Sequence, residues 1–125
     1  KNNNVRINFN QVDILNDEME YKTYDLIVSN PPYIAESEKQ AIEPNVLDFE
    51  PHLALFVPDS DPLIFYRKIA DLAIKLLIPG GELFFEINRA KGSDIVSLLT
   101  QKGFTGVQLR KDLSGNERMI KAVKR

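Results

Sequence analysis

The chain of 125 residues contains no cysteine, and its only histidine is His52. Without cysteine there can be no disulfide, no thiolate nucleophile and no zinc–thiolate site. A single histidine cannot supply a multi-histidine metal site either, and we therefore expect no bound metal. Any chemistry has to be carried out by amides, carboxylates, hydroxyls and backbone groups.

Strong charge and long apolar runs are also missing. The formal net charge is −2, with 16 Lys and Arg against 18 Asp and Glu, so nothing predicts a surface for nucleic acid. No apolar run is long enough to span a bilayer, no signal peptide is visible, and no membrane partner is expected. The length allows one domain with a modest core, which we expect to be soluble and cytoplasmic.

The most informative stretch runs from Asp25 to Tyr33. Residues 26–28 are apolar and include two β-branched side chains, which is typical of a strand. Pro31 and Pro32 end that strand, because proline has a fixed φ and no backbone N–H. Ligands in open α/β sheets bind just beyond the carboxyl ends of strands, so this turn is a candidate site.

The residue types in Asn30-Pro31-Pro32-Tyr33 favour one kind of ligand. The Asn30 side chain and the proline carbonyls are hydrogen-bond acceptors, and Tyr33 adds a flat apolar face. This combination suits a planar group that carries an NH2, such as an amide or the exocyclic amine of a base. The alternative is a proline-rich turn that only caps the strand. We consider it the weaker interpretation, because Asn and Tyr flank the prolines directly after an apolar strand.

The turn resembles the motif of S-adenosylmethionine-dependent methyltransferases that act on planar nitrogens. These include N6-adenine DNA methyltransferases and the glutamine N5-methyltransferases of peptide chain release factors. Further segments resemble the second family, in the same order along the chain. They are residues 50–56, 65–69, 80–87 and 112–120. The chain is thus similar to the C-terminal half of the release factor glutamine N5-methyltransferase family, which has a class I methyltransferase fold.

The resemblance implies S-adenosylmethionine as cofactor and a peptide chain release factor as protein substrate. Asn30, Pro31, Pro32 and Tyr33 would then be the catalytic residues that hold the glutamine amide, and Asp13, Ile14 and Asn30 would lie beside the cofactor. From the residues alone, an Asp13 that merely caps a turn is an equally good interpretation. Methylation of adenine N6 in DNA or RNA, and an inactive fragment or scaffold of the same fold, are the alternative functions.

The hydrophobic periodicity predicts an α/β order of elements. A helix should begin at Pro62 with Asp61 as its N-cap and end at Pro79-Gly80-Gly81. A second helix should open at Gly92 or Ser93, with Gly103 after its end. Residues 34–61 form a long connecting loop. Strands are predicted at 5–12, 24–29, 83–87, 104–109 and 118–123, the last two as an antiparallel pair.

This order matches the second half of a class I methyltransferase sheet, which is mostly parallel and ends in an antiparallel strand. By resemblance, the strand order of the family is 3-2-1-4-5-7-6, and the chain would supply strand 3 and strands 4 to 7. Gly80-Gly81 follows a helix and precedes a strand, which is the wrong order for the family's cofactor-binding turn. We therefore expect residues 1–125 to be an incomplete catalytic domain without that Gly-rich half or the N-terminal helical domain.

An incomplete sheet has a consequence for the strand at 24–29. Its outer edge would be apolar and would lack a native neighbour, and such edges pair with other chains. We expect the isolated chain to be inactive and not to bind the cofactor productively. It would dock residues 5–12 against this edge, self-associate through the edge, or need the missing segment.

Overall fold

The computed structural model describes residues 6–16, 22–32, 34–35, 56–57 and 60–125. Within these residues, four strands form one mixed sheet in the order β1-β4-β6-β5. The strands are β1 (Tyr24–Ser29), β4 (Leu77–Glu86), β5 (Thr105–Lys111) and β6 (Glu117–Val123). β1 is parallel to β4, whereas β6 is antiparallel to both β4 and β5. This is the predicted order 4-5-7-6 of a Rossmann-like methyltransferase sheet, with its antiparallel C-terminal strand.

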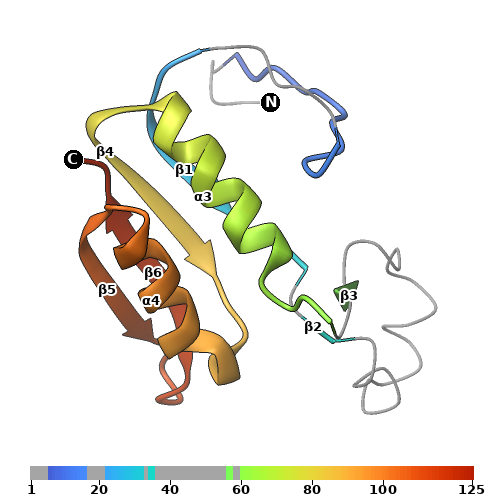
Figure 1. Cartoon of the computed structure of the whole chain (residues 1–125), viewed down its shortest axis with the longest axis vertical. Helices are drawn as coiled ribbons and strands as arrows, with labels where there is room; N and C mark the ends of the chain where they lie inside the picture. The colour runs from blue at the N-terminus through green and yellow to red at the C-terminus, as the bar shows by residue number, and fades with distance from the viewer. Residues whose placement is uncertain (1–5, 17–21, 33, 36–55, 58–59) are drawn as a thin grey trace.

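Helices α3 (Ile64–Leu76) and α4 (Gly92–Gln101) lie against the sheet, and the 3-10 turn η2 (Arg89–Lys91) precedes α4 (Figure 1). The strands β2 (Ile34–Ala35) and β3 (Phe56–Val57) form a separate parallel pair of two residues each. Most of the predicted loop 34–61, including Glu50 and His52, lies outside the described residues. No helix in the described ranges is long and apolar enough to cross a membrane.

The core forms where the helices cover the middle of the sheet. In β4 and the residue after it, alternate side chains Leu83, Phe85 and Ile87 are fully buried, as the period of a strand dictates. Leu83 and Phe85 pair with Ala122 and Ile120 of β6, which are also fully buried. The helices add an apolar stripe at helical spacing: Tyr66, Ile69, Ala70, Ala73, Leu76, Ile95 and Leu99.

The start of α3 differs from the prediction. The helix begins at Ile64 with Leu63 as N-cap, and that position makes no side-chain cap. Asp61 binds Arg67 through both carboxylate oxygens, at 2.6 and 2.9 Å, and its carbonyl accepts the N–H of Ile64 at 3.3 Å. Pro62 therefore lies in the turn before the helix, because the Asp61 carboxylate forms an ion pair with the helix instead of capping it.

The end of α3 also differs. The helix ends at Leu76, three residues before Pro79, and the backbone is already extended at Leu77. Pro79-Gly80-Gly81 thus belongs to β4, and the prediction that it ends the helix was wrong. Gly80 has a φ of 85° and donates its N–H to the Lys124 carbonyl at 2.8 Å. In return, the Lys124 N–H donates to the Gly81 carbonyl at 2.9 Å. Pairing with the chain end holds this segment extended.

The C-terminal elements agree with the prediction. α4 begins at Gly92, and Gly103 follows its end with a φ of 96°. β5 and β6 form the expected antiparallel hairpin. In its turn, Asp112 Oδ1 accepts the N–H groups of Ser114 and Asn116 at 2.9 and 3.0 Å.

The predicted strand at 5–12 is not found, since residues 6–12 form no strand in the structure. A strand needs a hydrogen-bonded neighbour, and these residues pair with no described strand, including the outer edge of β1. Their apolar side chains are correspondingly open: Ile7 is 50% and Phe9 84% exposed. The predicted docking of this segment on β1 therefore does not occur, whereas the predicted apolar edge of β1 is present among the described strands.

Candidate active site

The pocket of interest opens at the carboxyl end of β1 and has a volume of about 750 Å³. Three segments supply its walls: the stretch before β1, the end of β1 with the turn that follows, and the first turns of α3. The lining residues are Gln11 to Asn16, Ile27 to Pro32, Phe65 and Ile69. The structure thus brings Asp13 and Ile14 together with Asn30, Pro31 and Pro32 around one space, although Ile14 and Asn30 are 16 positions apart in the sequence.

The turn after β1 is anchored by its prolines. Ser29 is the last paired residue of the strand, opposite Phe85 of β4, so Asn30 stands immediately beyond the sheet. Pro31 is buried, Pro32 is partly buried, and Asn30 is exposed to the pocket. Both prolines have a fixed φ, which restricts the backbone of the turn and the directions of its carbonyls. Tyr33 lies outside the described residues.

Asp13 organises the opposite wall. Its Oδ1 accepts the N–H of Leu15 at 3.0 Å, and its Oδ2 accepts the side-chain Nδ2 of Asn16 at 2.8 Å. The Asn16 N–H also donates to the Asp13 carbonyl at 3.1 Å. The Asn16 side chain and then the Leu15 N–H hold the pKa of Asp13 below its ordinary value, so the carboxylate stays ionised. Asp13 caps a turn, as one sequence interpretation had it, and that turn lines the pocket.

The pocket also has lining residues that were not predicted to belong to a site, among them Asn16, Phe65 and Ile69. Residues four apart share one face of a helix, and this face is directed partly to the pocket and partly to the core. Periodicity marks such a face as apolar, but it contains no signal that separates a core contact from a pocket wall.

Tyr66 connects the start of α3 to β4. This side chain is 1% exposed, its hydroxyl donates to the Glu86 carbonyl at 3.1 Å, and its ring packs edge-on against Phe85 with centroids 5.0 Å apart. Tyr66 therefore ties the first turns of α3, which line the pocket through Phe65 and Ile69, to the end of β4. No group of three or more acidic residues and histidines that could hold a metal occurs in the described ranges.

A second, smaller space continues from the pocket along the outer edge of β1. It has a volume of about 300 Å³ and apolar walls. Ile14, Ile27, Val28 and Ile69 line it as well as the main pocket. The site therefore merges with the unpaired side of the sheet.

The strand order and the position of the pocket define the class: the chain has the C-terminal part of a Rossmann-like methyltransferase fold. No family model matches the chain. A solved structure of a release factor-specific protein-(glutamine-N5) methyltransferase from Alicyclobacillus acidocaldarius has 27% sequence identity and a TM-score of 0.52. That match covers 82% of this chain and 50% of the other.

Curated relatives point to the same family. The chain is 48% identical over 126 residues to the release factor glutamine methyltransferase of Bacteroides thetaiotaomicron, and this alignment covers 98% of the chain. It is 50% identical over 119 residues to the protein of that name from Flavobacterium psychrophilum, which covers 95% of this chain. Over nearly its whole length, the chain is similar to part of the release factor glutamine methyltransferase family, which confirms the resemblance.

The alignments cover only part of each curated relative. The chain spans less than half the length of the curated relatives, 45% of the first and 42% of the second. The activity of the full-length relatives therefore cannot be assigned directly to these 125 residues.

Proposed function

We propose that the chain is part of an S-adenosylmethionine-dependent methyltransferase that methylates the side-chain amide of a glutamine in a peptide chain release factor. The observation that carries this proposal is the pocket that the Asn30-Pro31-Pro32 turn and the Asp13–Asn16 turn line together. The names of the relatives agree with it. In this proposal, residues 1–125 are an incomplete catalytic domain and are inactive alone.

The turn after β1 would orient the substrate amide. An amide nitrogen is a poor nucleophile because its lone pair is delocalised into the carbonyl. The Asn30 oxygen and the Pro31 carbonyl would each accept one proton of the NH2 group, and Tyr33 would cover the amide plane. Both hydrogen bonds strengthen as positive charge develops on the nitrogen, so they stabilise the transition state more than the ground state.

The other wall would hold the cofactor. S-adenosylmethionine supplies an electrophilic methyl group on a sulfonium, so the amide needs no metal for activation. The turn at Asp13 and Ile14, together with Phe65 and Ile69, offers acceptors and apolar surface of the kind that a flat heterocycle requires. These residues would hold the cofactor, which would supply the methyl group, while Asn30 and Pro31 would hold the amide nitrogen that accepts it and then gives up a proton to water. No strong general base is needed, and we assign none.

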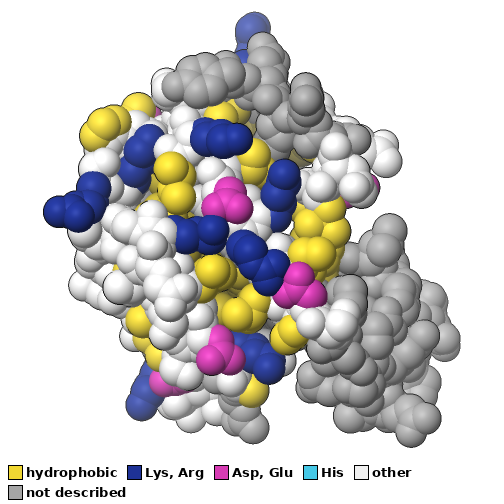
Figure 2. Space-filling view, in the orientation of Figure 1, with side chains coloured by type: hydrophobic (Ala, Val, Ile, Leu, Met, Phe, Trp, Pro, Cys, Tyr) yellow, Lys and Arg dark blue, Asp and Glu magenta, His cyan; other side chains and the backbone are white. Residues whose placement is uncertain are grey.

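Adenine N6 is the second candidate acceptor, because it is also a planar NH2 group. The distribution of charge on the surface gives little support for binding of nucleic acid. On the face that α3 and α4 present, Lys and Arg side chains are interspersed with acidic and apolar ones and form no continuous basic stripe (Figure 2). A translation factor as substrate also implies a cytoplasmic enzyme.

A chimera tests the proposal. This chain replaces the matching segment of the Bacteroides thetaiotaomicron relative, and the product is incubated with methyl-labelled S-adenosylmethionine and either a release factor or duplex DNA. We expect label in the release factor, on a glutamine located by mass spectrometry. Label in DNA alone would overturn the proposal in favour of adenine. A folded chimera without activity on either acceptor, beside an active parent enzyme, would favour the inactive scaffold.

A further inference from the structure

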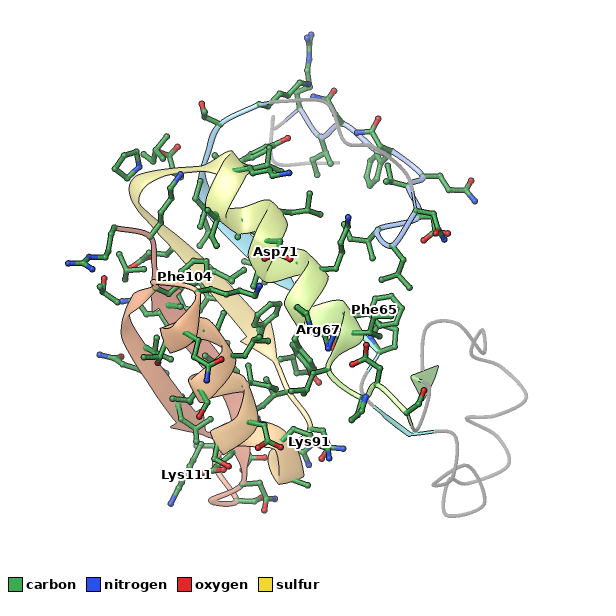
Figure 3. The ribbon with its side chains drawn as sticks, in the orientation of Figure 1. Phe65, Arg67, Asp71, Lys91, Phe104 and Lys111 are labelled. Carbon is green, nitrogen blue, oxygen red and sulfur yellow. The ribbon has the colours of Figure 1, made fainter. Side chains whose placement is uncertain are left out.

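Arg67 and Asp61 form an ion pair at the start of α3. Arg67 Nη2 donates to Asp61 Oδ1 at 2.6 Å, and Nη1 donates to Oδ2 at 2.9 Å. A contact at two points fixes the planes of both groups, which the single ammonium of a lysine cannot do. Figure 3 shows Arg67 near Phe65 at the start of the helix, with Asp71 one turn further along. The ion pair therefore attaches Asp61 to the first turns of α3.

This attachment restricts the chain that leads back to β3 and β2. Val57, the last residue of β3, is four positions before Asp61, and four residues of chain span at most about 14 Å. Ile34, the first residue of β2, is two positions after Pro32, which corresponds to at most about 7 Å. β2 and β3 pair with each other, and Figure 1 shows both beyond the first turn of α3. A short path thus joins Asp61 to the turn at Asn30.

The β2–β3 pair needs such an attachment because it is short. It consists of two residues from each strand. Each backbone hydrogen bond adds little net free energy, since it replaces a bond to water, and isolated two-stranded pairs are marginal even when they are longer. On the β2 side, the buried Pro31 holds the chain. On the β3 side, the ion pair of Asp61 does so.

We propose that Arg67 is a positioning residue for the turn at Asn30. Its bonds to Asp61 hold β3, β3 holds β2, and β2 limits the movement of the Asn30 amide. This inference rests on the proposed function, in which Asn30 orients the substrate amide. Arg67 itself does not line the main pocket, so it acts through Asn30. Such an effect can be large, because a misplacement of about 1 Å can lower a rate roughly 100-fold.

The same helix offers a matched control. Asp71 forms an ion pair with Lys102, the first residue after α4, at 2.5 Å, and neither residue lines the main pocket. Both ion pairs of α3 are partly exposed to solvent, so each contributes little to the stability of the whole fold. A difference in turnover between Arg67 and Asp71 variants therefore measures the position of the site and not the stability of the helix.

The kinetic experiment uses the chimera with a release factor and methyl-labelled S-adenosylmethionine. Arg67→Ala should lower kcat roughly 10- to 100-fold and change the KM for the cofactor much less. Arg67→Lys should recover part of the loss, and Asp71→Ala should keep full turnover. In the Asn30→Ala background, Arg67→Ala should cost little more, because residues that act through one another are not additive. Circular dichroism melting shows whether each variant has kept its fold.

A second measurement does not depend on activity. In NMR spectra of the 125-residue chain, Arg67→Ala should shift or broaden the amide signals of Asn30 and Ile34. Asp71→Ala should leave both signals in place. The amide signal of Phe85, which is fully buried in β4, should stay unchanged in both variants and serves as the reference for an intact core.

Two results would overturn the role of Arg67. One is a folded Arg67→Ala chain in which the Asn30 and Ile34 signals are unchanged; the other is a chimera in which Arg67→Ala and Asp71→Ala have the same kcat. Failure of the proposed function looks different. A chimera that methylates nothing, beside an active parent enzyme, removes the proposed reaction, while a shifted Asn30 signal in Arg67→Ala would still show that Arg67 holds the turn.

Discussion

The edge strand β1 and its neighbour β4 have similar apolar sequences, but their side chains are buried to very different degrees. On the face that packs against the core, Leu83 and Phe85 of β4 are fully buried, whereas Ile27 of β1, which pairs with Leu83, is only partly buried. On the other face of β1, Leu26 is 50% and Val28 is 69% exposed. β4 lies between β1 and β6, while β1 has one neighbour among the described strands. An apolar strand is buried by the strands and helices around it, and its own sequence does not decide the result.

The same difference locates the site. The pocket and the apolar space beside it both lie on the β1 side of the sheet, where walls come from three separate segments. On the β5–β6 side, the hairpin and α4 pack tightly, with Ile95, Leu99 and Ile120 fully buried. Ligand sites need open space, and the pocket at Lys102 and Lys124 on this side is much smaller, at about 170 Å³.

The largest expected effect compares one leucine from each strand. Leu83→Ala should lower the free energy of unfolding by about 2–5 kcal/mol, because it removes a fully buried side chain and leaves a cavity. Leu26→Ala should cost less than about 1 kcal/mol, since half of that side chain is already exposed. Urea denaturation followed by circular dichroism measures both. Equal losses for the two variants would show that β1 is packed as tightly as β4.

The next effect concerns catalysis in the chimera. Asn30→Ala should lower kcat roughly 10²–10³-fold, the usual cost of losing one positioned hydrogen-bonding group in a comparable role. The KM for the cofactor should change much less, because the amide contact strengthens in the transition state. Steady-state methylation kinetics give both constants.

Asn8 is the matched control for Asn30, since it is exposed and lines none of the pockets described above. Asn8→Ala should leave kcat unaltered, and an Asn30→Ala enzyme with full turnover would remove Asn30 from the site. At Tyr33, Phe should be milder than Ala if the face of the ring matters more than its hydroxyl.

A smaller effect is expected in the association of the chain. The apolar edge of β1 should make the 125-residue chain self-associate, with an apparent mass above that of the monomer in light scattering. Leu26→Lys should restore the monomer, because an edge lysine opposes strand pairing. Leu113→Lys, in the exposed hairpin turn, should not. A well-folded monomer that binds S-adenosylmethionine at micromolar concentration would contradict both the edge and the expectation that this chain is incomplete.

These two sides of the molecule also differ in how well the sequence predicted them. The α4 helix and the β5–β6 hairpin were predicted correctly, since their periodicity and their Gly103 and Ser114–Asn116 turns are local signals that agree with the packing. The turn at Asn30 was placed at a strand end for the same reason. A local pattern predicts an element correctly where the packing around that element agrees with it.

Predictions failed where a distant contact decides the outcome. The segment 5–12 has the pattern of a strand, but a pattern does not create the neighbour that a strand requires. Pro79-Gly80-Gly81 became part of β4 because Lys124, at the other end of the sequence, pairs with it. Phe65 and Asn16 joined the pocket because the fold brings α3 close to a turn some 50 residues earlier. Such contacts have no signal in a single sequence.

The smallest expected effect is a change in titration, and it compares one aspartate turn from each side of the sheet. Asp13 and Asp112 both have a pKa below the ordinary value of 3.8, but for different reasons. The Asn16 side chain is the main cause for Asp13, and the Asn116 N–H is the main cause for Asp112. Because each folded-state pKa is lowered, the turn's hydrogen bonds contribute stability above pH 3.8, and this contribution is lost as the pH falls through the lowered value.

Asn16→Ala should therefore raise the pKa of Asp13 toward 3.8 and leave that of Asp112 unchanged. Carboxyl-detected NMR of the folded chain, followed from neutral pH downward, measures both groups in one sample. The Leu15 amide signal should change with the Asp13 titration, since its N–H donates to Asp13 Oδ1. If Asp13 titrates in Asn16→Ala as it does in the unaltered chain, Asn16 does not hold this wall of the pocket, and the Asp13–Asn16 turn depends on its backbone bonds alone.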